Sequence, residues 1–363
     1  MLEKGKISGR QLMVLVLLYT IGDSILVLPT IVTAEANRDA WISGLLAIGL
    51  GPLIMSYLYQ SLAKSFPDLT VVEYGERIFG KWIGKIVAFL FVTYFFITAS
   101  TYLREIGDFI NTEFLPKTPM IIVTSFFMII IIMAANLGLE TLVRSAEFFF
   151  PIIFFLLLLL FVCLLPSIQF DYIKPMVEGG IKPIIRGTIP FIALPFMEPV
   201  AILMVLPYVS NKKIIQKSLF RGAILGGIVL FTTTLFVILV LGANFSANNL
   251  YPSYELARSI AIEDLFRIEA SLAIIWLITI FIRLSLFFYV TALGIAQMLE
   301  LKEYRLLNLP LAMLLIVFTM VIGSNVIEYN HIISGVWIYY VITFGFGIPF
   351  IMWVVARLRF ANQ

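Results

Sequence analysis

The segment Pro190-Phe191-Ile192-Ala193-Leu194-Pro195-Phe196-Met197-Glu198-Pro199 decides the fold, because it sets three prolines into an apolar run. Each proline lacks a backbone N–H donor and crowds the preceding turn, so a continuous helix through this segment would lose several backbone hydrogen bonds. The first apolar run of the chain holds a second interruption, Gly22-Asp23-Ser24, with Pro29 close behind. Glycine weakens a helix, and Asp and Ser compete for its backbone hydrogen bonds. The two segments therefore predict two broken helices, with an unwound segment in the second.

The composition of the chain around these segments excludes a soluble domain. Of 363 residues, 61% are hydrophobic and 13% are charged, and the mean hydropathy is +1.03. Soluble domains carry about 25% charged residues, so this chain cannot cover a water-facing surface. The net charge of +3 is too small to indicate nucleic-acid binding. We expect a polytopic α-helical membrane protein whose outer surface contacts the lipid bilayer.

Ten apolar runs are long enough to cross the bilayer as helices, since a crossing takes about 20 residues. They cover about 11–33, 41–63, 83–104, 119–138 and 145–166, and then 187–209, 214–243, 270–299, 308–326 and 332–356. With the N-terminus inside, the inner segments hold about twice as many Lys and Arg residues as the outer segments, and positive residues favour the cytoplasmic side. We therefore predict ten spans with both ends of the chain in the cytoplasm.

Two amphipathic linkers indicate that the chain consists of two related halves. Residues 67–85 follow the second span and residues 244–269 follow the seventh, and each linker interleaves apolar with charged side chains, as interfacial helices do. Because five is an odd number of spans, the second half enters the membrane from the opposite side. The sequence thus predicts one transmembrane domain, 1–363, with inverted repeats at about 8–166 and 184–358. In secondary transporters of this plan, interrupted first helices point to the substrate site.

The chemistry of the two breaks suits a zwitterion. Free N–H groups at the start of a half-helix attract a carboxylate, whereas freed carbonyls and side-chain oxygens attract an ammonium group. An α-amino acid or a similar small polar nutrient would meet both requirements. The alternative is that the prolines only kink two otherwise regular helices, as prolines do in many membrane proteins.

Three charged residues fall inside the predicted spans, namely Asp23, Glu198 and Arg283. An unpaired charge at the bilayer centre costs at least about 2.5–3.5 kcal/mol, so we expect each charge to have a partner or water. Our hypothesis is that Arg283 pairs with one or both carboxylates and takes the place of a coupling sodium ion. A static structural ion pair is the alternative.

Polar residues on two further spans are additional candidates for lining the site. Tyr94, Thr98 and Thr101 recur at spacings of three and four residues, which puts them on one face of the third span. Thr279 lies one helical turn before Arg283 in the eighth span. The alternative is that these side chains form hydrogen bonds between helices, as polar groups in membrane proteins often do.

Several classes of function lack their sequence signals in this chain. It has no phosphate-binding loop, no dinucleotide fingerprint and no HExxH motif. Cys163 is its only cysteine, which excludes a disulfide within the chain and a thiolate-rich metal site. His331 is its only histidine, and the sequence therefore argues against a His-rich metal site and a His-based triad. We expect no enzyme activity, no cofactor and no metal.

The opening Ile7-Ser8-Gly9-Arg10-Gln11-Leu12, followed by Gly22-Asp23-Ser24-Ile25-Leu26-Val27-Leu28-Pro29, resembles the spore germination permease family. Residues 69–84 and 190–199 are also similar, and the resemblance covers essentially the whole chain. These proteins are the B subunits of nutrient germinant receptors in endospore-forming bacteria. The resemblance implies an all-α fold of the amino acid–polyamine–organocation superfamily, which is the five-plus-five inverted repeat of the leucine-transporter type.

The resemblance also implies a role, partners and a site. Family members sense small nutrients such as amino acids in the spore inner membrane, beside a germinant receptor A subunit and a C-subunit lipoprotein. Their ligand site falls between spans 1, 3, 6 and 8. The ligand-binding candidates in this chain are then Gly22, Asp23, Ser24, Tyr94, Thr98, Thr101, Ala193, Leu194, Phe196, Glu198, Thr279 and Arg283.

Three functions are compatible with this plan. In a receptor subunit, ligand binding shifts a conformational equilibrium that partner subunits read, which requires a ligand that prefers one state. A secondary transporter of amino acids or other small solutes would share the architecture, and so would a ligand-opened conduit for ions and small solutes. The resemblance favours the receptor, whereas composition and spacing alone favour the transporter.

Overall fold

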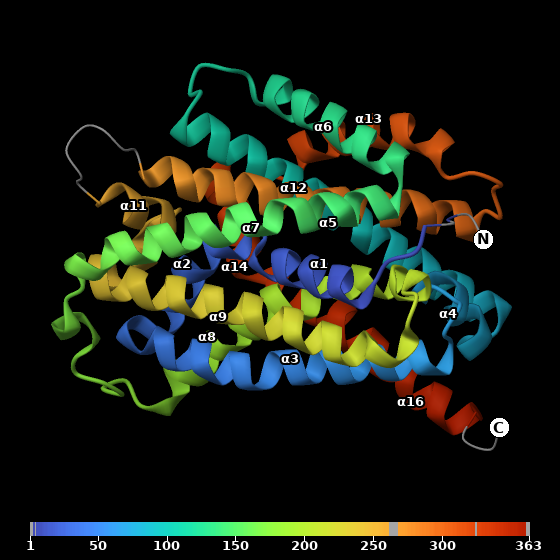
Figure 1. The fold of residues 1–363 in the computed structure, drawn as a ribbon, viewed down its shortest axis with the longest axis horizontal. Coiled ribbons are helices and arrows are strands. Elements are labelled where there is room, and N and C mark those ends of the chain that lie inside the picture. Colours follow the sequence, from blue (N-terminus) through green and yellow to red (C-terminus); the bar gives the residue numbers. More distant parts are fainter. Residues whose placement is uncertain (1–2, 4, 261–267, 324, 361–363) are drawn as a thin grey trace.

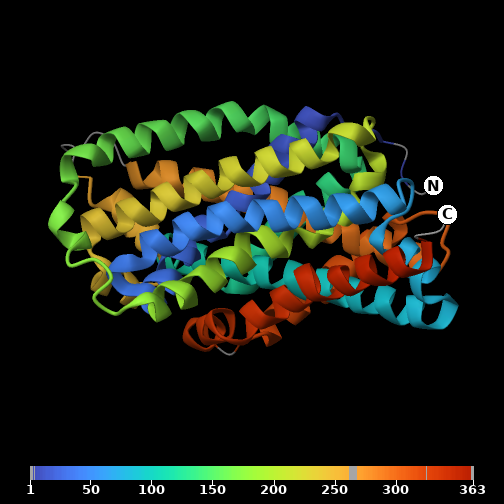
Figure 2. The same cartoon turned by 90° about the horizontal axis from the view of Figure 1, so that it is seen from below.

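The computed structural model describes residue 3 and residues 5–260, 268–323 and 325–360. Figures 1 and 2 show long helices that run side by side along one common direction. By length and composition, eight helical stretches in the described residues can cross a membrane, and two shorter apolar helices, Gly9–Ile21 and Arg305–Val321, accompany them. One of the eight, Ser24–Ser65, contains half of a broken span and the whole of the next one. The described elements therefore make the ten predicted crossings.

The first five crossings begin with a broken span. Its halves are α1 (Gly9–Ile21) and α2 (Ser24–Ala36), and the short helix η1 (Asn37–Asp39) turns the chain back toward the second crossing. The other four crossings of this half are single helices: α3 (Ala40–Ser65), α5 (Lys81–Glu113), α6 (Met120–Leu137) and α7 (Leu139–Leu164).

The second five crossings also begin with an irregular span, in which α8 (Ile181–Ile192) continues as η4 (Ala193–Met197) and η5 (Glu198–Met204). Single helices form the next three crossings: α9 (Ile215–Leu241), α12 (Ile268–Met298) and α13 (Asn308–Val321). The last crossing consists of α15 (Val336–Ile342), η9 (Thr343–Gly347) and α16 (Ile348–Phe360), preceded by α14 (Val326–Ser334). Short 3₁₀ helices lie in the connections: η2 (Leu165–Ser167), η3 (Phe170–Ile173), η6 (Leu206–Tyr208), η7 (Lys212–Ile214) and η8 (Arg305–Leu307).

Both amphipathic linkers, for which interfacial helices were predicted, contain short helices. In the first, α4 (Val71–Phe79) starts at a capping box, in which Thr70 and Glu73 satisfy each other's backbone N–H groups. The second linker holds α10 (Ala243–Asn248) and α11 (Pro252–Arg258), and its residues 261–267 lie outside the described residues. Figure 1 places α4 and α11 at opposite ends of the bundle. This arrangement matches one linker on each side of the membrane.

Both termini lie at the same end of the bundle, as an even number of crossings requires (Figures 1 and 2). The N-terminal segment fastens this end. Ile7 pairs with the chain that follows the sixth crossing, because its N–H donates to the Tyr208 carbonyl at 3.0 Å and its carbonyl accepts from Ser210 N–H at 2.9 Å. The buried Glu3 carboxylate accepts from the Tyr289 hydroxyl of α12 at 3.0 Å. The segment therefore links both halves of the fold.

A second tyrosine contacts Glu3 from the loop between α12 and α13. Burial raises the pKa of Tyr304 to about 12, and the nearby Glu3 carboxylate acts in the same direction. The hydroxyl therefore stays protonated at neutral pH and can donate to Glu3, whose carboxylate oxygen lies 3.5 Å away.

The third crossing is longer than predicted and carries charges that the sequence analysis placed outside it. The prediction ended this span at residue 104, whereas α5 continues to Glu113. Arg104 donates to Asp108, one turn further on, at 2.8 Å, and both side chains are buried. Because the two charges neutralise each other, the helix extends past them. Arg104 and Asp108 are therefore two further buried charges on the helix that forms the third crossing.

The surface of the bundle is apolar enough to contact acyl chains. Large apolar side chains point outward from α6 and α7, including Phe126 at 68% and Phe148 at 70% exposure. Soluble monomers rarely expose contiguous apolar areas of this kind, which mark membrane or protein contacts. The expected lipid-facing surface is therefore present on the described helices.

Candidate functional site

The first break lies between α1 and α2, at Gly22. This residue has a positive φ of 30°, a conformation that side chains with a Cβ rarely adopt. A Cβ there would also lie 2.5 Å from Arg283 Nη1 and 2.8 Å from the Tyr19 carbonyl oxygen. Glycine is therefore required both by the backbone turn and by the close approach of Arg283. The predicted break in the first span is confirmed.

The second break is a change in helical winding and not an unwound segment. From α8 the chain widens into the π-helix η4 and then tightens into the 3₁₀ helix η5. Pro195 and Pro199 cannot donate the bonds of a regular α-helix, and the altered turns accommodate this loss while the chain stays coiled. The prediction that regular helix ends here is confirmed, and the prediction of an open, unwound segment is wrong.

The altered winding leaves backbone carbonyls that side chains from other helices bind. Leu194 O accepts from Arg283 Nη2 at 3.3 Å, Met197 O accepts from the Tyr59 hydroxyl at 3.0 Å, and Glu198 O accepts from the Tyr19 hydroxyl at 3.2 Å. Buried carbonyls need such partners, because an unpaired one costs free energy. The second break is thus fastened by α1, α3 and α12.

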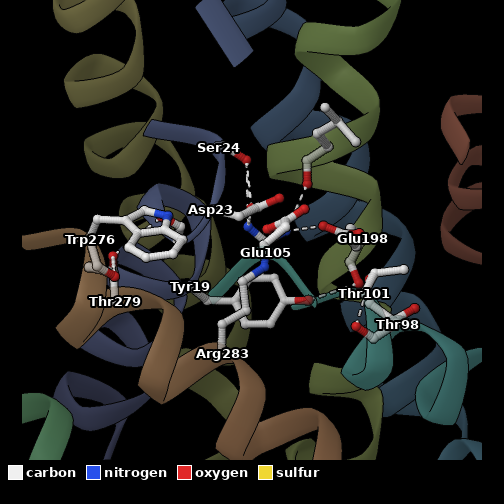
Figure 3. A network of polar contacts seen from close by, with 12 residues as sticks. Tyr19, Asp23, Ser24, Thr98, Thr101, Glu105, Glu198, Trp276, Thr279 and Arg283 are labelled. Carbon is white, nitrogen blue, oxygen red and sulfur yellow. Dashed lines mark hydrogen bonds and ion pairs between the residues drawn. The ribbon is translucent and has the colours of Figure 1, made fainter. Parts of the chain in front are cut away.

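Arg283 joins the two breaks (Figure 3). Its guanidinium, which is fully buried, donates from Nη1 to the Asp23 carboxylate and from Nη2 to the Glu198 carboxylate. Ser24 Oγ donates to Asp23 Oδ1 at 3.2 Å. Trp337 Nε1 donates to the second oxygen of Glu198, Oε1, at 3.2 Å. The hypothesis that Arg283 pairs with one or both carboxylates is confirmed, since it pairs with both. Its role in place of a coupling sodium ion stays a hypothesis.

Two tyrosine rings enclose the guanidinium. Its central carbon lies 4.6 Å from the ring centroid of Tyr19 and 4.8 Å from that of Tyr102. Cation–π contacts of this kind are worth about 2 kcal/mol or more where water is excluded. The cluster of Asp23, Glu198 and Arg283 therefore combines opposite charges, freed carbonyls and aromatic faces around one buried cation.

Sequence reasoning missed three members of this arrangement: Tyr19, Tyr102 and Trp337. Tyr19 precedes the first break by three residues, so its helical spacing from Gly22 was an available signal. Tyr102 follows Thr98 by four residues and shares the face already selected on the third span. Trp337 lies far from either break in the sequence, and the local pattern around it gives no signal for its contact with Glu198.

The other predicted residues divide into two groups. Thr279 contacts the first break, because its hydroxyl oxygen lies 3.3 Å from the Gly22 carbonyl oxygen. Thr98 and Thr101 instead donate to carbonyls of their own helix, Tyr94 O and Thr98 O, both at 2.8 Å. The Tyr94 ring stacks on Phe344 with centroids 4.7 Å apart. On this face of the third span Tyr102 contacts Arg283, whereas the hydroxyls of Thr98 and Thr101 bond within their own helix.

Two predicted residues of the second break, Phe196 and Ala193, are packed inside the protein. Phe196 packs its ring against α3 and α9, so close that a Cβ on Gly51 would lie 2.2 Å from it and a Cβ on Gly227 would lie 2.9 Å from it. Ala193 is fully buried at the start of η4. Phe196 thus wedges the π-helix against two neighbouring helices.

A second buried polar group lies further along α5. Glu105 accepts from the Tyr329 hydroxyl of α14 at 2.9 Å, and the same hydroxyl lies 3.1 Å from the Thr101 carbonyl oxygen. Arg104 donates to the Gly323 carbonyl at 2.7 Å. These contacts tie the third crossing to the start of the tenth. In the described part of the chain, no group of three or more His, Cys, Asp or Glu residues could hold a metal ion.

Comparison with known sequences gives consistent matches over nearly the whole chain. A family model described as "Spore germination protein" matches residues 6–325. Spore germination protein KB of Bacillus subtilis (strain 168) is 28% identical over 360 residues, which cover 98% of this chain and 95% of that protein. Spore germination protein YndE of the same strain is 25% identical over 361 residues, covering 98% and 97% of the two chains.

Comparison with solved structures identifies the fold. The crystal structure of MhsT in complex with L-phenylalanine has a TM-score of 0.69 at 13% identity, covering 98% of this chain and 99% of that chain. Mhp1, a nucleobase-cation-symport-1 family transporter in a closed conformation with bromovinylhydantoin bound, has a TM-score of 0.68 at 11% identity, covering 96% and 78%. At these identities the likeness establishes the fold alone, which is the leucine-transporter type.

Proposed function

Because the chain belongs to the family of spore germination proteins, multi-pass proteins of the spore inner membrane, we propose that it is the nutrient-binding membrane subunit of a germinant receptor. The nutrient is an amino acid or a similar small zwitterion, and it binds between the break at Gly22 and the π-helix η4. The observation that carries this proposal is the buried Arg283, held between Asp23 and Glu198 at the point where both breaks meet.

The charges of the cluster favour an additional cationic group. With both carboxylates ionised, Asp23 and Glu198 carry two negative charges against the single positive charge of Arg283. An α-ammonium group would balance the remaining charge and could donate hydrogen bonds to carbonyls at the breaks, such as Leu194 O. Charge-assisted hydrogen bonds of this type are roughly twice as strong as neutral ones.

The start of α2 suits the carboxylate of the same ligand. Asp23 occupies the N-cap position of α2, but its side chain makes no capping hydrogen bond because it is paired with Arg283. The amides at the start of a helix carry partial positive charge, although in α2 the Leu26 N–H already donates to the Asp23 carbonyl at 2.9 Å. A ligand carboxylate placed there would be stabilised by this partial charge, as anions are at helix N-termini.

Unpaired buried donors support a polar ligand in the same region. Arg283 Nε and Trp276 Nε1 are buried and have no hydrogen-bond partner among the described residues. Both belong to α12, and Trp276 lies one turn before Thr279, which contacts the first break. Buried donors are normally paired, so a ligand or ordered water is the expected partner.

The fixed cation favours a receptor over an ion-driven transporter. A guanidinium that belongs to the chain cannot leave with a substrate, so it cannot couple transport to an ion gradient as a bound sodium ion would. Ligand binding would instead shift the balance between two conformations, provided that the ligand prefers one of them. The A subunit and the C-subunit lipoprotein would then read this change. The alternative is an amino acid permease, which the likeness to transporter folds supports.

A pair of matched variants tests the site. Purified protein is first screened by thermal shift against amino acids and sugars, and the affinity of the stabilising compound is then measured by calorimetry. Glu198→Gln should weaken binding by about tenfold to a hundredfold, the value of a hydrogen bond to a charged group. Glu105→Gln removes another buried carboxylate outside the cluster and should leave the affinity unchanged. Equal effects of the two changes would refute the proposed location.

Uptake measurements separate the receptor from the permease. The purified protein in vesicles is supplied with the radiolabelled ligand under an imposed sodium or proton gradient. A receptor binds the compound without accumulating it inside the vesicles. Accumulation above the external concentration would establish the permease instead.

A further inference from the structure

A groove opens between α3 and α9, away from the cluster at the breaks. The two helices lie side by side in both views of the bundle (Figures 1 and 2). At the end where α9 begins, they leave a groove of about 640 Å³ whose lining includes Leu53 and Ile54 of α3 and Phe220 of α9. Leu53 is 54% exposed, so the apolar wall of the groove faces the surroundings of the protein.

The polar end of the groove carries two positive charges. Lys213 and Lys217 line it, and both side chains are exposed. Lys213 lies in η7 and Lys217 in the first turn of α9, and both contribute to the lining of the same groove. Gln216, between them in the sequence, also lines the groove, and no carboxylate is among its described lining residues. The groove therefore offers ammonium and amide donors without a competing acid.

Neighbouring aromatic residues place this polar end at the level of the lipid headgroups. Tyr57 lines the groove and packs edge-on against Trp353 of α16, with ring centroids 6.3 Å apart. Arg357 lies over the same Trp353 ring at 4.8 Å. Tyr, Trp and basic residues gather at the boundary between acyl chains and headgroups. In the predicted orientation this boundary is the cytoplasmic one.

We propose that the groove binds an anionic phospholipid of the surrounding bilayer. Its phosphate lies between Lys213 and Lys217, and an acyl chain follows Leu53, Ile54 and Phe220 toward the membrane centre. Basic pockets between membrane helices on the cytoplasmic side have the right chemistry for such headgroups. Charge complementarity selects a phospholipid over an apolar protein helix, which would leave both ammonium groups without partners.

The position of the groove gives the lipid a structural effect. The helix pair that forms it also clamps Phe196 of η4, between Gly51 of α3 and Gly227 of α9. A lipid that fixes the spacing of α3 and α9 would therefore stabilise the contact that holds the second break. This proposal does not depend on the identity of the nutrient or on the site at Arg283.

Lipid binding to delipidated protein tests the proposal directly. Native mass spectrometry and thermal unfolding are compared with phosphatidylglycerol and with phosphatidylcholine of the same acyl chains. Wild-type protein should bind phosphatidylglycerol more tightly and should be stabilised by it. The double change Lys213→Gln with Lys217→Gln should weaken that binding about thirtyfold, because each Lys near an anionic headgroup contributes about 1 kcal/mol. Binding of phosphatidylcholine should not change.

Two further variants keep the result decisive. Lys81→Gln with Lys85→Gln makes the same charge change on the same predicted side of the membrane, outside the groove, and should preserve the preference for phosphatidylglycerol. Leu53→Trp fills the groove while leaving both lysines, and it should weaken the binding of both lipids. The exposed position of Leu53 accommodates the larger ring. This variant therefore still tests lipid binding to the groove if the lysine variant fails to fold.

Several outcomes would overturn the proposal. One is equal binding of the two lipids by wild-type protein, and another is a preference for phosphatidylglycerol that survives the double lysine change. Stabilisation by soluble glycerol phosphate to the same extent would show an anion site that needs no lipid. A photo-crosslinker placed at Tyr57 that captures a partner subunit in spores, and no lipid, would show that the groove is a protein interface.

Discussion

Arg283 is the residue on which the centre of the molecule depends. It is fully buried, and its two terminal nitrogens reach carboxylates from two different spans, Asp23 and Glu198. Taking such charges out of water is expensive, and good geometry with additional hydrogen bonds is needed to offset that cost. The carbonyl of Leu194 and the rings of Tyr19 and Tyr102 provide this support.

Replacing Arg283 tests the pairing. Arg283→Leu leaves two buried carboxylates without their cation, and breaking a buried ion pair costs about 3–5 kcal/mol. We expect a large fall in the melting temperature of the purified protein. Adding Asp23→Asn and Glu198→Gln to the same variant should recover part of the loss, because the uncompensated charges are then gone. A melting temperature of Arg283→Leu equal to that of wild type would contradict the account.

Gly22 allows a matched test of the first break. Gly22→Ala forces a Cβ into a backbone conformation with φ of 30° and against Arg283. Strain of this kind costs about 1–3 kcal/mol, and we expect a lower melting temperature and weaker nutrient binding. Gly49→Ala makes the same change on α3, where a Cβ would meet no atom within 4 Å. The control should melt no lower than wild type, and equal losses in both variants would refute the role of Gly22.

Single residues were predictable from the sequence where charge or backbone chemistry made them unusual. The sequence alone predicted the pairing of Asp23, Glu198 and Arg283, because charged residues are rare in membrane spans. Trp337 could not be found in this way, because aromatic residues are common in such spans and its contact depends on how distant helices pack. Tyr102 had a signal of another kind, its spacing of four residues from Thr98. Thr98 and Thr101 stay predicted lining residues, and their hydroxyls donate to carbonyls of their own helix, which a polar face in the sequence does not reveal.

The two irregular elements of the second half contact each other. The π-helices η4 and η9 pack so closely that a Cβ on Gly345 would lie 2.1 Å from the Met197 carbonyl oxygen. The Tyr59 hydroxyl lies 3.0 Å from Met197 O and 2.9 Å from Gly345 O, so it bridges the two elements. The sixth and tenth crossings are therefore joined where their backbones depart from the α-helix. π-helical turns often mark functional positions in helices.

A change at Gly345 should separate these elements. In Gly345→Ala the added methyl group cannot fit against η4, and overpacking of this kind costs about 1–3 kcal/mol. Gly347→Ala adds the same group to η9 where the nearest atom is 3.8 Å away. We expect the first variant to lose thermal stability and nutrient binding and the second to retain both. If Gly347→Ala were as damaging as Gly345→Ala, the contact between the π-helices would not be the cause.

Prediction at the level of elements was accurate for their existence and less so for their internal form. Pro195 and Pro199 correctly indicated where the regular helix ends, whereas Pro190 lies within α8. They could not show whether the chain opens or changes its winding, because that choice depends on side chains such as Tyr19 and Tyr59 from other helices. In the same way, the mutual neutralisation of Arg104 and Asp108 extended α5 beyond the predicted end of its span.

At the scale of the whole molecule, ten crossings and a leucine-transporter-type fold follow from apolar runs, an odd number of spans in each half and two breaks. The division into repeats at about 8–166 and 184–358 stays a prediction. So does the orientation, which rests on the distribution of Lys and Arg. The division into repeats and the orientation depend on each other, because inverted repeats require the two amphipathic linkers to lie on opposite sides of the membrane.

Cysteine labelling tests the orientation. On a Cys163→Ala background, Lys302→Cys and Lys117→Cys each place one exposed thiol in a loop, and the prediction puts residue 302 inside and residue 117 outside. A membrane-impermeant maleimide applied to intact cells should label only Lys117→Cys. Lysed membranes should label both variants. Labelling of Lys302→Cys alone in intact cells would reverse the assigned sides.

The location of the bound nutrient is the most direct test of the central claim. A cryo-EM structure of the protein with the amino acid that stabilises it would show where that molecule lies. The account predicts density between Gly22 and η4, within hydrogen-bond distance of Asp23 or Glu198. Density confined to the outer cavity of about 340 Å³ lined by Glu35, Arg186 and Tyr339, with the Arg283 cluster unoccupied, would contradict it.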